Sequence, residues 1–94
     1  MNLAIEFEWS KENPQCVRAS GSLTVRRVVY DVRLRQVHLG LLRDEAVSYA
    51  DIDGRLLVTR ADGSGRPPSA HLLVETKRAV AEALDTEAVK RGAY

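Results

Sequence analysis

The fold is decided by residues 23–39, which read LTVRRVVYDVRLRQVHL. From Val28 to Arg35 every even position is apolar, while the odd positions hold Val29, Asp31 and two arginines. Alternation with a period of two predicts a β-strand with one buried face and one solvent-exposed face. Guanidinium groups dominate the exposed face of this strand.

The residues that precede this stretch predict two further strands. In the first, every second residue is apolar, and the residues between them are small, polar or acidic. The apolar residues are Leu3, Ile5, Phe7 and Trp9. Residues 11–14 then supply a turn. Residues 17–25 keep one parity across Gly21, which favours a single bent strand over a hairpin at residues 20–22. The parity shifts near Arg26 and Arg27, through a β-bulge or a tight connection, and shifts again before Val37.

The second half of the chain predicts a hairpin, a loop and one helix. Residues 40–49 fit a loop or a short helix, and the loop is favoured. Asp53-Gly54 suits a type I′ turn between strands at 47–52 and 55–60. Residues 61–69 form a Gly/Pro loop, after which helical spacing extends over 70–91, with Ser69 as N-cap and Gly92 as the stop. A fifth strand at 70–75 is the alternative.

These elements predict an α+β fold, a curved antiparallel β-meander of four to five strands with one C-terminal helix packed on one face. Residues 1–94 form a single domain, divided into a β-sheet region (1–60), the loop (61–69) and the helix (70–91). One helix covers only part of such a sheet, so a second copy or a partner is expected to close an edge or the remaining apolar surface.

Composition limits the compartment and the chemistry. The single cysteine, Cys16, allows no internal disulfide. The longest apolar runs are too short to span a membrane, and Glu6 and Glu8 stand where a signal peptide would be basic or apolar. We therefore expect a cytoplasmic protein. The net charge is +1, but residues 16–43 carry six arginines against Asp31, and acidic blocks flank them. This pattern indicates a binding face or internal pairing of neighbouring strands.

No residue cluster has the spacing of a catalytic or metal site. The two histidines, His38 and His71, lack a partner histidine or cysteine at ligand spacing. Cys16 and His38 could meet as nucleophile and base, but nothing in the sequence predicts an oxyanion hole beside them. We expect no enzyme activity, no cofactor and no metal.

The arginine-rich strand supplies the candidate binding residues, which are Arg27, Arg33, Arg35 and Asp31. Arginine pairs with carboxylates at protein interfaces, whereas a single-strand nucleic-acid platform also needs exposed aromatic side chains. The leading hypothesis is a small non-catalytic protein that acts by protein–protein contact. Its size and its arginine-rich strand would suit a phage or mobile-element inhibitor of a host complex, such as an anti-CRISPR. The alternatives are a nucleic-acid-binding module, a structural or assembly subunit and, for the partner, a second copy in a homodimer.

Overall fold

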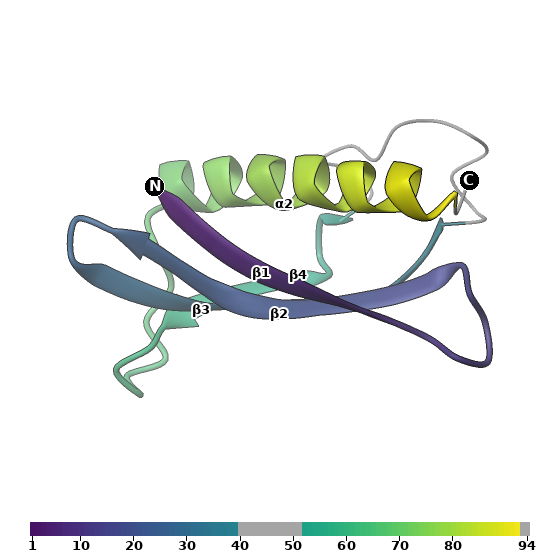
Figure 1. The fold of residues 1–94 in the computed structure, drawn as a ribbon. Helices are drawn as coiled ribbons and strands as arrows, with labels where there is room; N and C mark the ends of the chain where they lie inside the picture. Colours follow the sequence, from purple (N-terminus) through teal and green to yellow (C-terminus); the bar gives the residue numbers. More distant parts are fainter. Residues whose placement is uncertain (40–51, 93–94) are drawn as a thin grey trace.

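The computed structural model describes residues 1–39 and 52–92, which form four strands and one long helix. The elements are β1 (Asn2–Trp9), β2 (Cys16–Val25), β3 (Val28–His38), β4 (Leu56–Arg60) and α2 (Ala70–Arg91). The strands form one antiparallel sheet in the order β1-β2-β3-β4. Figure 1 shows a curved sheet with α2 lying along one of its faces. The predicted α+β meander with a C-terminal helix is confirmed.

The second strand passes unusually close to the first at Gly21. β2 runs unbroken through this glycine, which pairs with Ile5 of β1, so the predicted bent strand is confirmed. A Cβ atom at Gly21 would lie 2.0 Å from the carbonyl oxygen of Ala4 and 2.7 Å from the Cα atom of Ile5. Only glycine permits this approach of the two backbones.

A two-residue turn at Arg26 and Arg27 joins β2 to β3. Val25 pairs with Val28, and the two arginines have φ angles of +47° and +69°. Positive φ at both central residues is the geometry of a type I′ turn, which usually contains Asn-Gly. Of the two interpretations of the first parity shift, the tight connection is therefore confirmed.

The second parity shift is a β-bulge in the third strand. Leu34 pairs with Ala19 and Val37 pairs with Val17, so β3 has one residue more than β2 between these pairs. Residues 35–36 are both exposed, and burial resumes at Val37. The bulge turns the end of β3 so that its apolar residues again face the core.

β4 lies beside β3 at the outer edge of the sheet, and the turn at Asp53-Gly54 that precedes it is not the predicted type I′ turn. Gly54 has a φ angle of +78°, but Asp53 is not among the residues with positive φ, and a type I′ turn requires positive φ at both. The turn is closed by a hydrogen bond of 3.0 Å from the Arg55 N–H to the Ile52 carbonyl. The predicted type I′ turn is therefore wrong. Residues 40–51 lie outside the described residues. They include the whole segment 40–49 and all of the predicted strand at 47–52 except Ile52.

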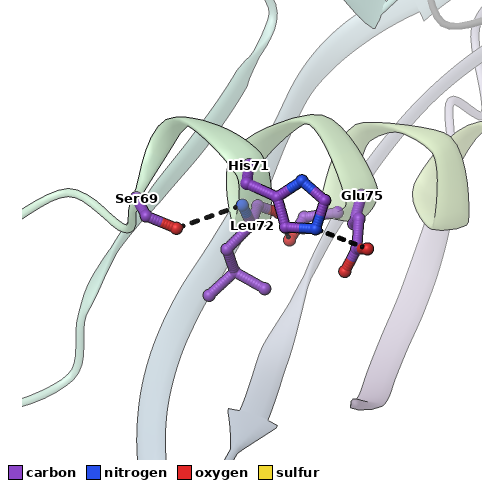
Figure 2. A network of polar contacts seen from close by, with 5 residues as sticks. Ser69, His71, Leu72 and Glu75 are labelled. Carbon is purple, nitrogen blue, oxygen red and sulfur yellow. Dashed lines mark hydrogen bonds and ion pairs between the residues drawn. The ribbon is translucent and has the colours of Figure 1, made fainter.

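The helix begins and ends where its sequence signals predict. The Oγ atom of Ser69 accepts a hydrogen bond of 3.2 Å from the Leu72 N–H, and one turn later His71 Nε2 lies 3.0 Å from Glu75 Oε1 (Figure 2). Gly92 ends the helix with a φ angle of +67°, and its N–H donates to the last helical carbonyls. Helix 70–91 is confirmed, and the alternative strand at 70–75 is wrong.

The hydrophobic core lies between α2 and the facing side of the sheet. Leu23 and Leu34 of the central strands and Val80 and Leu84 of the helix are almost fully buried. Thr76 is also buried, and its hydroxyl donates to a helical carbonyl at 2.7 Å. The equivalent apolar row of β1 is only half-buried, because β1 is an edge strand. Burial therefore decreases from the middle of the sheet toward β1.

Candidate protein-binding face

The side of the sheet that faces away from α2 carries the candidate site, which we call the open face. Among the described elements only α2 packs on the sheet, and it lies on the opposite side (Figure 1). Strand alternation and register assign the members of the open face, which are Asn2, Ala4, Glu6, Glu8, Arg18, Ser20, Ser22, Thr24, Val29, Asp31, Arg33, Arg35, Leu57 and Thr59. All four strands therefore contribute to one polar surface.

A shallow groove of about 680 Å³ crosses the open face. Its base is on β2, where Ser20 has a short side chain. Glu6 of β1 and Arg33 of β3 pair with Ser20 from its two sides, so they stand roughly 9.5 Å apart, or two strand spacings. Glu8 and Arg35 extend the two walls. We call this feature the charged groove, and it has an acidic wall on β1 and a basic wall on β3.

The two arginines of the basic wall differ in what they contact. Arg35 donates from Nη2 to the Gly54 carbonyl at 2.9 Å, which holds it near the turn before β4. Arg33 is exposed, and within residues 1–39 and 52–92 its guanidinium group has no hydrogen bond or ion pair. Their Cα atoms are roughly 6.5–7 Å apart, as for any two residues at positions i and i+2 of a strand. Arg33 is therefore available to a binding partner.

The acidic wall includes one ion pair. The Arg18 Nη2 and Glu8 Oε1 atoms are 2.5 Å apart, and both side chains are about two-thirds exposed, at 64% and 68%. The hydrogen bond from Arg18, followed by its positive charge, lowers the pKa of Glu8 below the ordinary value. Such an exposed pair contributes little to stability, because water and salt screen it. Its main effect is to hold the Glu8 carboxylate in place and ionised.

The structure brings together three of the four predicted binding residues. Asp31, Arg33 and Arg35 lie along one strand on the open face. Arg27 is exposed but lies in the β2–β3 turn, about 17–20 Å along β3 from the charged groove at 3.3 Å per residue. On the open face, the expected internal pairing of neighbouring strands occurs between Arg18 of β2 and Glu8 of β1. Arg33 and Arg35 form no such pair with Glu6 or Glu8, because β2 separates β3 from β1.

Sequence reasoning missed the acidic wall and the exposed Leu57 of the open face, whereas the alternation of β3 already placed Val29 on its exposed side. Glu6 and Glu8 alternate clearly with the apolar row of β1, but their position opposite Arg33 depends on strand order. Leu57 pairs with Arg33 and is 58% exposed. Val29 is 43% exposed near the hairpin end of the same face. The open face therefore combines both signs of charge with exposed apolar groups.

Cys16 and His38 are cross-strand neighbours, as the sequence allows. Cys16 is 5% exposed, and His38 Nε2 lies 3.1 Å from the Asn13 side-chain amide nitrogen. The amide of Asn13 thus joins the β1–β2 turn to the end of β3. Burial of the thiol leaves a substrate no direct approach to it.

Two other classes of site are absent from the described residues. No group of three or more His, Cys, Asp or Glu side chains in this part of the chain could hold a metal ion. None of the described helices combines the length and the apolar character needed to cross a membrane. The open face is the surface that the remaining observations support.

No protein-family model, characterised protein or solved structure matches the chain. The role of the open face is therefore inferred from its own geometry and charge.

Proposed function

We propose that the protein is a non-catalytic binding protein whose open face contacts a partner protein at the charged groove. The observation that carries this proposal is the charge balance of the face. On the four strands, three guanidinium groups, from Arg18, Arg33 and Arg35, are matched by the three carboxylates of Glu6, Glu8 and Asp31. Arg55, just before β4, adds a fourth guanidinium, which donates to the Gln36 carbonyl at 2.9 Å and leaves the face close to neutral. Such a surface has almost no net attraction for a polyanion, whereas a protein surface can match both signs at once.

The arrangement of the charges gives the partner an orientation. Acidic side chains of the partner would lie over Arg33 and Arg35, and basic ones over the wall formed by Glu6 and Glu8. Guanidinium groups form two parallel hydrogen bonds with a carboxylate, which favours a defined contact at Arg33. Leu57 lies beside Arg33 and supplies exposed apolar area. Apolar contact next to desolvated charge pairs is typical of the centre of protein interfaces.

The binding mode is compatible with the inhibitor role expected from the sequence. A small rigid sheet that covers a functional surface of a larger complex needs no catalytic group of its own. The single buried thiol of Cys16 suits a reducing compartment such as the cytoplasm. Inhibition of a host complex by occupation of one of its surfaces is therefore part of the proposal.

A charge-reversal capture experiment tests this proposal. Tagged wild-type protein and the double variant Arg33→Glu/Arg35→Glu would be used to capture partners from cells of the native host, followed by quantitative mass spectrometry. The control, Arg66→Glu/Arg78→Glu, makes the same change in net charge at exposed positions outside the open face. We expect one protein to be lost with the open-face variant and retained with the control. Equal capture by both variants would contradict the proposal.

The nucleic-acid alternative has a distinct outcome. If β3 contacts phosphates, the wild type would bind generic duplex or single-stranded DNA or RNA, with log affinity falling linearly with log salt concentration. Loss of two phosphate contacts in Arg33→Glu/Arg35→Glu would reduce that slope by roughly 1.4–1.8. Fluorescence anisotropy with labelled oligonucleotides measures this. Tight, salt-dependent binding of this kind would replace protein contact as the function of the open face.

A further inference from the structure

The two edges of the sheet are protected to very different degrees. β4 has five residues, and Arg60 places a charge in its inward row. The following loop also covers this edge, because the Arg60 N–H donates to the Arg66 carbonyl at 2.8 Å. β1 has eight residues and contains no proline, no lysine, no bulge and no inward charge. Such features normally prevent a sheet edge from pairing with another strand, so β1, whose two charged residues Glu6 and Glu8 both lie on the open face, is the less protected edge.

The hydrogen-bond phase of β1 follows from the end of the strand. The Ser10 N–H donates to the Cys16 carbonyl at 2.9 Å, and in the β1–β2 register these two residues are opposite each other. Every second residue of an antiparallel strand bonds to the same neighbour, so the even residues of β1 bond to β2. The backbone N–H and C=O groups of Leu3, Ile5 and Phe7 therefore point away from β2. Of the described strands, only β2 pairs with β1.

The side chains of the same three residues are incompletely covered. Leu3, Ile5 and Phe7 pack against the core and are only half-buried. By contrast, Ala19 and Leu23 of β2, which are the register partners of Phe7 and Leu3, are only 4% and 0% exposed. A further strand beside β1 would cover the exposed part of this apolar row and satisfy the outward backbone groups.

We propose that two copies of the chain form a symmetric dimer by antiparallel pairing of β1 with β1. The register is centred on Ile5, which lies opposite Ile5 of the second copy, and Leu3 lies opposite Phe7 of the second copy. All three residues belong to the outward-bonding set, so each pair exchanges both backbone hydrogen bonds. The apolar row then continues across the two-fold axis. A second copy fits this edge because the contact is self-complementary.

Charge disfavours the register that is centred one residue further along β1. When the register is centred on Ile5, Glu6 lies opposite Ala4 of the second copy and Glu8 lies opposite Asn2. A shift that centres it on Glu6 would place two Glu6 carboxylates directly opposite each other, which is destabilising. The two-fold axis is perpendicular to the sheet, so both α2 helices lie on one side and both open faces on the other. The dimer therefore leaves the charged groove of each copy accessible.

The position opposite Glu6 allows a test of the register. Ala4 is exposed, so Ala4→Lys and Ala4→Glu place opposite charges at one position outside the core. Two such contacts form per dimer, and opposite charges on directly opposed residues stabilise a strand pair while like charges destabilise it. We expect Ala4→Lys to dimerise about tenfold more tightly than Ala4→Glu. The same pair of changes at Thr59, on the same face but in β4 at the opposite edge of the sheet, is the control and should leave dimerisation unchanged.

Sedimentation equilibrium of the purified protein over a range of concentrations measures the association. The expected mass rises from 10.4 kDa toward twice that value. Amide hydrogen exchange by NMR then locates the contact. The amides of Leu3, Ile5 and Phe7 should gain protection as concentration rises, while those of Glu6 and Glu8 are protected throughout. A monomer at every concentration, a dimer without protection of these three amides, or equal affinities for the two Ala4 variants would overturn the proposal.

Discussion

Replacement of Gly21 by alanine is expected to destabilise the protein strongly. The new Cβ atom would lie 2.0 Å from the Ala4 carbonyl oxygen and 2.9 Å from its carbonyl carbon, and both are backbone atoms. To restore an ordinary contact, β1 must move away from β2 by about 1 Å, which stretches adjacent hydrogen bonds beyond about 3.5 Å. Loss of two or three such bonds, at about 1 kcal/mol each, predicts a destabilisation of about 3 kcal/mol.

Urea denaturation followed by tryptophan fluorescence measures this effect, since Trp9 is the only tryptophan and lies in β1. A loss of about 3 kcal/mol is a large part of the total stability of about 5–15 kcal/mol expected for a domain. The control is Ser22→Ala, one residue further along β2, where the side chain points to the open face. It should change stability by less than about 0.5 kcal/mol. If Gly21→Ala were as stable as this control, the close approach of β1 and β2 would be refuted.

Two further predictions concern the β2–β3 turn and the acidic wall. Arg26→Asn/Arg27→Gly should raise the free energy of unfolding by about 1 kcal/mol, since it relieves two positive φ angles at arginine. A higher melting temperature checks this, and a lower one would contradict it. Arg18→Gln should raise the pKa of Glu8 toward its ordinary value, as measured by NMR titration. In the wild type, the stabilisation from this pair is complete above the unfolded-state pKa and is lost as the pH falls through the lowered folded-state pKa.

Local patterns were sufficient to predict the individual elements. The alternation of β1 and β3 and the helical spacing after Ser69 each depend on neighbouring residues, so the sequence contains them directly. Both parity shifts were visible for the same reason. The sequence does not distinguish a β-bulge from a tight turn at the first shift, because arginine seldom occupies the left-handed region and so gives no turn signal. The prediction of a type I′ turn at Asp53-Gly54 was wrong because this dipeptide also fits turns with only one positive φ angle.

The candidate site was less predictable than the fold. Asp31, Arg33 and Arg35 share a face through the period of one strand, and this could be derived from sequence. The acidic wall opposite them depends on β2 lying between β1 and β3, which is a long-range pairing. The distance in space between Arg27 and the other three candidate residues depends on where β3 begins, because Arg27 lies in the turn before this strand. Strand order and element ends are decided by tertiary packing, so the charged groove emerges only in the folded chain.

Site-specific photo-crosslinking in cells of the native host tests the central claim most directly. A photoreactive amino acid would replace Thr59, on the open face, or Glu82, an exposed residue of α2, and adducts would be treated with nuclease or protease. We predict an adduct from the Thr59 position that is sensitive to protease, resistant to nuclease and absent from the Glu82 position. An adduct formed only from the Glu82 position, or a nuclease-sensitive adduct from the open face, would contradict the assignment of the open face as a protein-binding surface.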